Sequence, residues 1–129
     1  AENGLVLGYH NHGAEFNKEN DTYLLDTLMA KTNREIVMEL DTYWSAQAGV
    51  NTPQYMLDHQ GILPLIHLKD GDGENLTSIG EGKIDIQKVL DTAKAAGVDW
   101  VVVENDDPKP NGFEDAKRSM ENLKSKYIF

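Results

Sequence analysis

The sequence contains no cysteine, few prolines and no long apolar run, and each absence narrows the possible functions. Without cysteine the chain can form no disulfide framework, no thiolate metal site and no cysteine nucleophile. With 4 prolines among 129 residues and 40% apolar residues, the composition is that of a folded domain. Because no run of about 18 apolar residues and no signal peptide is visible, we expect no membrane partner. The expected location is cytoplasmic, although a leader could have been removed before Ala1.

Basic residues are also scarce relative to acidic ones. The chain has 12 Lys and Arg against 22 Asp and Glu, a formal net charge of −10. A nucleic-acid backbone needs a basic face, so nucleic acid is excluded as a partner, whereas a cation or a neutral polyol suits this balance. The sequence has no Walker motif, no dinucleotide fingerprint and no serine nucleophile elbow, which argues against ATP or nicotinamide cofactors.

Four strand-like segments alternate with four helix-like segments along the chain. We expect strands at about 5–11, 35–41, 63–69 and 99–104, and helices at about 21–31, 52–59, 84–96 and 113–126. This alternation predicts βαβ units and a parallel sheet, and the apolar runs IVMEL and WVVVE favour strands covered on both sides. Residues 1–129 therefore read as a single (βα)4 unit with parallel strands and outer helices, which has half the number of βα units of a TIM (βα)8 barrel.

An open four-stranded sheet has two edges that invite association. We therefore expect one of three arrangements: a homodimer, pairing with a missing half, or helices that cover the edges as in a small doubly wound domain. Among the helices, the first is expected to be capped by Asn20 or Asp21. The last is expected to bury an apolar stripe made of Phe113, Ala116, Met120 and Leu123.

Each predicted strand ends in side chains that can bind a metal. These are His10 and His12, Asp41, His67 and Glu104. Right-handed crossovers bring the C-terminal ends of parallel strands to one face, where active sites of such folds lie. Carboxylates and imidazoles suit a divalent cation.

The alternation of side chains along a strand adds three residues to this face. Glu39 shares a side with Asp41 and would need a partner there. Lys69 shares a side with His67, and Asp106 shares a side with Glu104.

Several motifs together resemble the xylose isomerase-like TIM barrel superfamily, and most of all its sugar phosphate isomerase/epimerase family. They are Tyr-His-Asn-His at 9–12 with Glu15-Phe16, Leu-Asp-Thr-Tyr-Trp at 40–44, His-Leu-Lys-Asp-Gly at 67–71, Gly-Glu-Gly-Lys-Ile-Asp at 80–85, and Val-Val-Glu at 102–104. The resemblance spans nearly the whole chain and corresponds to strands five to eight, the C-terminal half of the barrel.

The resemblance implies one divalent cation, Mn2+ most of all, with Mg2+, Zn2+ or Co2+ as alternatives. Asp41, His67 and Glu104 match three ligands of the family pattern. The fourth, a glutamate in the family, aligns with His10, so that His10, His12 or Glu15 could complete the set. Because both family glutamates serve as acid/base groups, this departure also raises a dehydratase or lyase as an alternative.

The implied chemistry is proton abstraction next to a carbonyl, with a metal-stabilised enediolate. Glu104 is the expected base, with His10 or His12 on the opposite face of the sugar. Lys69 is placed to hydrogen-bond a substrate oxygen, and Trp44 to pack on the sugar ring. The predicted activity is therefore a metal-dependent sugar isomerase or epimerase, with a small-molecule sugar or keto-sugar as substrate. A catalytically inactive half-barrel and a phosphodiester-cleaving enzyme of the same fold are competing hypotheses.

Overall fold

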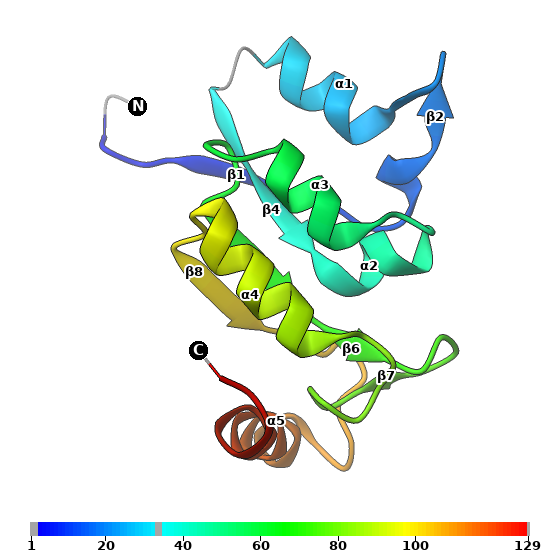
Figure 1. Ribbon diagram of the computed structural model, residues 1–129, viewed down its shortest axis with the longest axis vertical. Helices are drawn as coiled ribbons and strands as arrows, with labels where there is room; N and C mark the ends of the chain where they lie inside the picture. The colour runs from blue at the N-terminus through cyan, green and yellow to red at the C-terminus, as the bar shows by residue number, and fades with distance from the viewer. Residues whose placement is uncertain (1–2, 33–34, 129) are drawn as a thin grey trace.

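Four strands form one parallel sheet in the order β1-β4-β5-β8 (Figure 1). Their bounds are β1 Leu7–His10, β4 Ile36–Asp41, β5 Leu65–Leu68 and β8 Trp100–Val103. The computed structural model describes residues 3–32 and 35–128. In the register of the sheet, His10 lies beside Glu39, and Asp41 lies beside His67. The polar ends of the strands are therefore neighbours.

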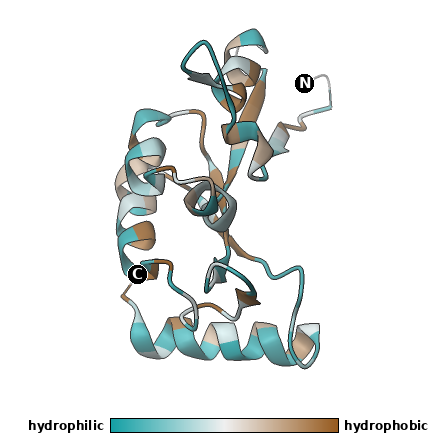
Figure 2. Ribbon diagram, turned by 90° about the vertical axis from the view of Figure 1, so that its right-hand side faces the viewer, coloured by the Kyte–Doolittle hydropathy of each residue, from teal (hydrophilic) through white to brown (hydrophobic). Residues whose placement is uncertain are grey.

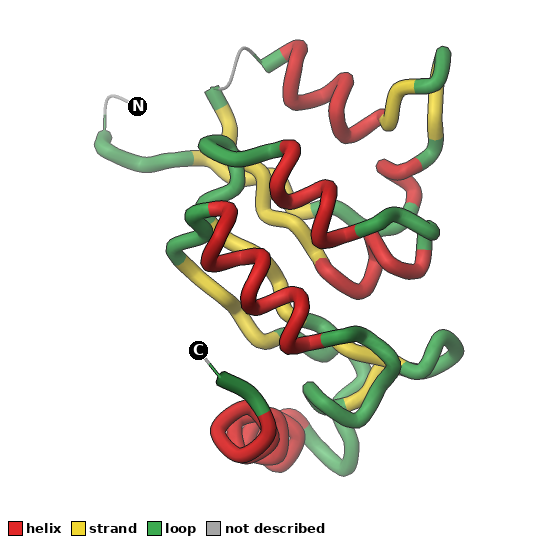
Figure 3. The backbone as a smooth tube through the Cα atoms, viewed as in Figure 1, coloured by secondary structure: helices red, strands yellow, loops and turns green. Residues whose placement is uncertain are grey.

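Most helices lie in the connections between these strands, and the last one follows β8. They are η1 Ala14–Phe16, α1 Leu24–Lys31, α2 Thr42–Gln47, α3 Thr52–Asp58, α4 Ile86–Ala96 and α5 Gly112–Lys126. Of these, α1, α3 and α4 lie on one side of the sheet (Figure 3). Two antiparallel ribbons, β2 Lys18–Glu19 with β3 Thr22–Tyr23 and β6 Asp70–Gly71 with β7 Leu76–Thr77, lie in the connections. None of the described helices has both the length and the apolar character needed to cross a membrane.

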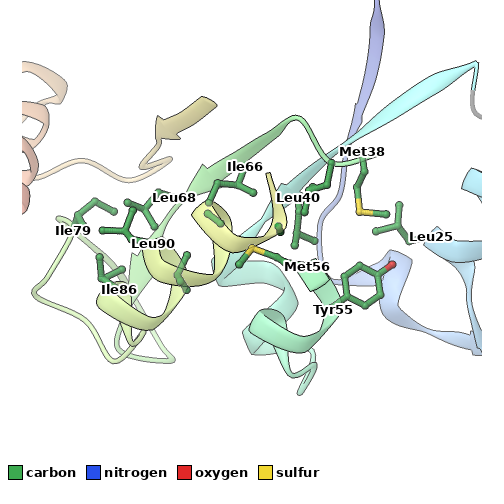
Figure 4. Packing of buried hydrophobic residues seen from close by; sticks show 14 of the residues in the cluster. Leu25, Met38, Leu40, Tyr55, Met56, Ile66, Leu68, Ile79, Ile86 and Leu90 are labelled. Carbon is green, nitrogen blue, oxygen red and sulfur yellow. The ribbon is translucent and has the colours of Figure 1, made fainter. Parts of the chain in front are cut away.

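The two faces of the sheet carry different side chains, because successive residues of a strand point to opposite sides. On the helix side, Met38, Leu40, Ile66 and Leu68 are fully buried. They pack with residues of α1, α3 and α4 such as Met56 (Figure 4). The opposite side carries the alternate residues, among which are the polar strand ends. Hydrophobic packing is thus confined to the helix side of the sheet.

The outer strands are more exposed than the sequence suggested. Trp100 of β8 is 70% exposed and Leu7 of β1 is 69% exposed, whereas β4 and β5 each have two fully buried apolar residues. The expectation that the WVVVE run is covered on both sides was therefore wrong within the described residues. β1 and β8 are the two edges of the sheet, so each has a neighbouring strand on one side only.

The last helix packs through polar rather than apolar side chains, which corrects the predicted stripe. Phe113 is 77% and Met120 is 45% exposed. The buried positions of α5 are instead Asp115, Ser119 and Leu123, so only Leu123 of the stripe is buried. Ser119 accepts a hydrogen bond from the backbone of residue 79 at 3.0 Å, and Asp115 accepts one from the hydroxyl of residue 78 at 2.6 Å. In Figure 2 most of the ribbon of this helix has the colour of hydrophilic residues.

The first helix begins later than predicted, which corrects its cap. Asn20 and Asp21 have φ angles of 50° and 63° and form the turn between β2 and β3. Two successive residues in the left-handed region are typical of a tight hairpin turn, in which asparagine and aspartate are favoured. The N-cap of α1 is Tyr23, without a side-chain hydrogen bond.

The glycine-rich connection after β5 is organised around Asp70, a fully buried carboxylate. It accepts hydrogen bonds from the backbone N–H groups of Gly71, Gly80, Gly82 and Ile84. A Cβ atom at Gly82 would collide with the Asp70 side chain, so only glycine fits there. This connection follows β5, which carries His67, and Lys69, the residue directly after that strand.

Candidate metal centre

Four side chains converge at the C-terminal end of the sheet. His10 ends β1, Asp41 ends β4, His67 lies in β5, and Glu104 follows β8. Each offers one ligand atom, and these atoms all lie within 4.8 Å of one another. The backbone N–H of Glu104 donates to the carbonyl of Leu68 at 3.2 Å, so the sheet pairing extends to this residue. The strand order therefore creates the cluster from four distant points of the sequence.

Asp41 is fully buried and is held from both sides. Its Oδ1 caps α2 by accepting from the backbone N–H groups of Tyr43 and Trp44, both at 2.9 Å. Its Oδ2 accepts from His10 Nε2 at 3.2 Å, and its own N–H donates to the buried Asn11 side chain at 3.0 Å. One carboxylate oxygen thus fixes the orientation while the other faces the cluster. The sequence analysis did not find α2, because it begins immediately after the strand.

Each ring nitrogen of His67 lies within hydrogen-bonding distance of a carboxylate. Nδ1 lies 2.7 Å from Glu104 Oε2, and Nε2 lies 2.5 Å from Glu39 Oε1. An ionised carboxylate only accepts hydrogen bonds, so a ring nitrogen that carries a proton can donate it to the carboxylate beside it. Glu39, for which the sequence analysis expected a partner on this side of the sheet, has His67 as that partner.

Lys69 is buried among carboxylates, with 1% of its side chain exposed. Its Nζ lies 3.0 Å from Asp41 Oδ2, 2.8 Å from Glu104 Oε2 and 2.8 Å from Asp106 Oδ2. Burial disfavours the ammonium, but the hydrogen bonds to Asp106, Glu104 and Asp41 outweigh it and raise the pKa of Lys69. The ammonium is therefore charged at neutral pH.

The pKa of Glu104 moves in the opposite direction. Burial alone would raise it, but hydrogen bonds from Lys69 and His67 outweigh this effect and lower the pKa of Glu104. Glu104 is therefore an ionised carboxylate at neutral pH, which is the state that a metal ligand or a general base requires.

The donor set fits a divalent cation in type and nearly in spacing. Metal–ligand bonds of about 2.0–2.2 Å place ligands of one ion at most roughly 4.4 Å apart. The observed spread of 4.8 Å requires a contraction of a few tenths of an ångström. Two imidazoles and two carboxylates can bind Mn2+, Mg2+, Zn2+ or Co2+, although these ions differ in their preference for nitrogen and oxygen ligands. His10, Asp41, His67 and Glu104 would hold the ion.

The other predicted site residues surround the cluster without joining it. The exposed His12 ring lies 4.9 Å from the His10 ring and 5.8 Å from the Trp44 ring. Trp44 lies beside Lys69, whose Nζ is 5.6 Å from the indole ring. Glu15 accepts hydrogen bonds from the Tyr9 hydroxyl at 2.8 Å and the His12 backbone at 3.0 Å, and so it braces the loop after β1.

Comparison with known proteins finds similarity in solved structures. No model of a protein family matches the chain, and no curated protein matches it. Two crystal structures of sugar phosphate isomerase/epimerases from Parabacteroides distasonis ATCC 8503 align with TM-scores of 0.81 and 0.78, at 23% and 22% identity. These alignments cover 97% and 92% of this chain, but 46% and 45% of the other chains. A D-tagatose 3-epimerase-like protein aligns with a TM-score of 0.69 at 24% identity, covering 95% of this chain and 47% of that protein.

These alignments confirm the expected fold. The chain is a (βα)4 half of a TIM (βα)8 barrel, with parallel strands and outer helices. It spans about half the length of the solved structures it matches. The resemblance to sugar phosphate isomerase/epimerase structures, inferred from short motifs, is therefore present in the three-dimensional fold.

Proposed function

We propose that this chain is the metal-site half of a divalent-metal-dependent sugar isomerase or epimerase, with Mn2+ as the cation. The observation that carries the proposal is the convergence of His10, Asp41, His67 and Glu104 within 4.8 Å at the strand ends. The similarity to solved structures of a sugar phosphate isomerase/epimerase and a D-tagatose 3-epimerase-like protein supports the same class. A bound divalent cation would supply Lewis-acid stabilisation of the negative charge that develops when a proton leaves carbon next to a carbonyl.

Glu104 is the proposed general base of this reaction. It is ionised at neutral pH and has 30% of its side chain exposed, so it can reach both the ion and a substrate. A positioned carboxylate contributes roughly 10²–10⁴-fold to a proton transfer. Lys69 would donate a hydrogen bond to a substrate oxygen from its place beside Glu104, and so it would offset developing charge.

The opposite acid/base group is proposed to be an imidazole. His10 ends β1 and His12 follows it, at the opposite edge of the sheet from β8 and Glu104, with the two rings 4.9 Å apart. If His10 holds the ion, His12 is the imidazole that remains for this role. An imidazole can return a proton to the other face of the substrate carbon, or can protonate a leaving hydroxyl. The second outcome is a dehydration, so the pair of histidines favours a sugar dehydratase as the second candidate.

The substrate is proposed to be a small sugar or keto-sugar bound between the cluster and the loop after β1. Trp44 would contact the apolar face of the sugar ring, and His12 would donate to a hydroxyl. Glu15 would act mainly through the loop that it braces, since both its oxygens already accept hydrogen bonds.

A second (βα)4 half is proposed to complete the binding pocket. We assign this chain to strands five to eight, with the partner being either a second copy or an N-terminal half-barrel. The edges of the sheet support this, since Leu7 of β1 and Trp100 of β8 are about 70% exposed. Two copies that close one barrel would give a dimer with two equivalent metal sites. Static light scattering and native mass spectrometry with Mn2+ distinguish this dimer from a metal-free monomer.

Deuterium exchange tests the proposed reaction directly. A panel of ketohexoses and their phosphates is incubated with the protein and Mn2+ in D2O, and NMR follows deuterium at carbons next to the carbonyl. We expect exchange with the natural chain and a loss of at least roughly a hundredfold in Glu104→Gln. Glu114→Gln, an exposed site on α5, is the matched control. Bound Mn2+ without any exchange would contradict the isomerase and leave the inactive half-barrel.

A further inference from the structure

The same oxygen atoms serve both the candidate metal centre and the Lys69 ammonium. Asp41 Oδ2 faces His10 Nε2 at 3.2 Å and Lys69 Nζ at 3.0 Å. Glu104 Oε2 faces His67 Nδ1 at 2.7 Å and Lys69 Nζ at 2.8 Å. The ammonium therefore bridges the two acidic members of the proposed ligand set. A divalent cation bound to both oxygens would have to share them with an existing positive charge.

Lys69 cannot easily leave this position. Its backbone is locked to Thr42, whose hydroxyl donates to the Lys69 carbonyl at 3.2 Å and accepts from the Lys69 N–H at 3.1 Å. Its side chain is almost completely buried. The ammonium must therefore stay near the cluster whether or not a metal is bound.

Asp106 gives the ammonium a third partner outside the ligand set. Its Oδ2 lies 2.8 Å from Lys69 Nζ, and half of its side chain is exposed. Asp106 is not among the four residues whose ligand atoms converge. It can therefore keep the ammonium neutralised when Asp41 and Glu104 turn to another cation.

We propose that Lys69 is the internal counter-cation of this site. In the metal-free protein it holds Asp41 and Glu104 together against their mutual repulsion, and on metal binding its ammonium shifts its hydrogen bonds toward Asp106. Lys69 is then a positioning residue that sets the affinity for the metal and the stability of the empty site. This inference rests on the proposed metal centre.

Two substitutions with opposite expected effects test this role, and isothermal titration calorimetry with Mn2+ is the measurement. Lys69→Met removes the competing charge, so we expect Mn2+ to bind roughly tenfold tighter or more. Asp106→Asn leaves the ammonium with the ligand carboxylates alone, so we expect weaker binding. Lys117→Met on α5 and Asp107→Asn make the same charge changes at exposed positions and control for net charge.

Thermal unfolding gives a second readout that does not depend on activity. Without metal, Lys69→Met should have a lower Tm than the natural chain, because the carboxylates then repel each other without a bridge. Mn2+ should raise the Tm of Lys69→Met by more than it raises that of the natural chain. Should Lys69→Met fold only with Mn2+ present, the inference is supported more strongly. Should it fold in neither condition, the Asp106→Asn titration decides.

The outcomes separate this inference from the proposed enzyme. Equal or weaker Mn2+ affinity in Lys69→Met, or unchanged affinity in Asp106→Asn, overturns the counter-cation while leaving the metal centre intact. Failure of every variant and of the natural chain to bind Mn2+ overturns both. In the unmodified protein, the 15N resonance of the Lys69 ammonium should shift on adding diamagnetic Mg2+ or Zn2+. An unmoved resonance under saturating metal contradicts the proposal.

Discussion

The same strands build two faces of the central sheet with opposite character. On the helix side, residues such as Leu40 and Ile66 are fully buried among apolar neighbours. One position away, Glu39, Asp41 and His67 belong to a network of polar side chains at the strand ends, which Lys69 and Glu104 connect. Because strand side chains alternate, stability and the proposed chemistry can be assigned to separate faces of one element. We therefore expect substitutions on the helix side to lower the free energy of unfolding, and substitutions on the opposite side to change metal binding.

We call the helix side of the sheet the covered face and the opposite side the open face. The largest loss of stability is expected on the covered face. Ile66→Ala removes a side chain with no exposed surface and leaves a cavity, so unfolding should be easier by about 2–5 kcal/mol. Leu65→Ala, the neighbouring residue on the open face, is only partly buried and should cost clearly less. Denaturant-induced unfolding of both variants measures the difference. Equal losses would show that the open face is buried in solution as well.

An effect on metal binding with little loss of fold is expected from Glu39→Gln on the open face. Glu39 holds His67 Nε2 at 2.5 Å, and so it orients the ring with Nδ1 toward Glu104. Residues that orient a metal-bound histidine in this way typically contribute 10–100-fold to affinity. We expect Mn2+ affinity to fall by about that factor, with the unfolding midpoint nearly unchanged. An unchanged Mn2+ affinity in calorimetric titration would show that Glu39 does not orient His67 for metal binding and only balances charge.

A smaller, pH-dependent effect is expected at the rim of the open face. Burial would raise the pKa of Glu15, but hydrogen bonds from Tyr9 and from backbone N–H groups outweigh it and lower this pKa. A lowered folded-state pKa stabilises the protein above the unfolded value of about 4.3 and loses this contribution as pH falls through the folded value.

Glu15→Gln should therefore be less stable than the natural chain at pH 7, by less than about 1 kcal/mol, and the gap should close as the pH falls below about 4. Denaturation curves at several pH values measure this gap. Ile66→Ala serves as the comparison, because no titrating group is removed and its stability loss should not follow pH. A Glu15→Gln gap that stayed constant with pH would refute the role of the carboxylate charge.

The sequence predicted the sheet well because each strand carries a strong local signal. The apolar runs of β4 and β5 and the helix signals around α3 and α4 are independent of the rest of the fold, so the alternation of strands and helices was recovered. Because the C-terminal ends of parallel strands meet on one face, the sequence also predicted that His10, Asp41, His67 and Glu104 lie together, as they do in the structure. Their role as metal ligands remains a prediction.

The features that the sequence did not reveal depend on distant contacts. The buried face of α5 is set by hydrogen bonds from residues 78 and 79 to Asp115 and Ser119, about 40 positions away, whereas local hydrophobicity favoured Phe113 and Met120. The pairing of Glu39 with His67 and of Asp106 with Lys69 required the register of adjacent strands. The exposure of β8 could not be read from its apolar run, because that exposure depends on which strand lies beside it.

The smallest effect on the single chain is expected at that exposed edge. Trp100 on β8 is 70% exposed, so Trp100→Ser should change the unfolding free energy by no more than about 0.5 kcal/mol. A solvent-exposed tryptophan on an unpaired strand edge is nevertheless unfavourable for an isolated domain, and a second half-barrel would bury it. Light scattering should therefore show a dimer or complex with the natural chain and weaker association with Trp100→Ser. If the natural chain is monomeric and Trp100→Ser behaves identically, the edge is simply open and the comparison of the two faces describes the complete molecule.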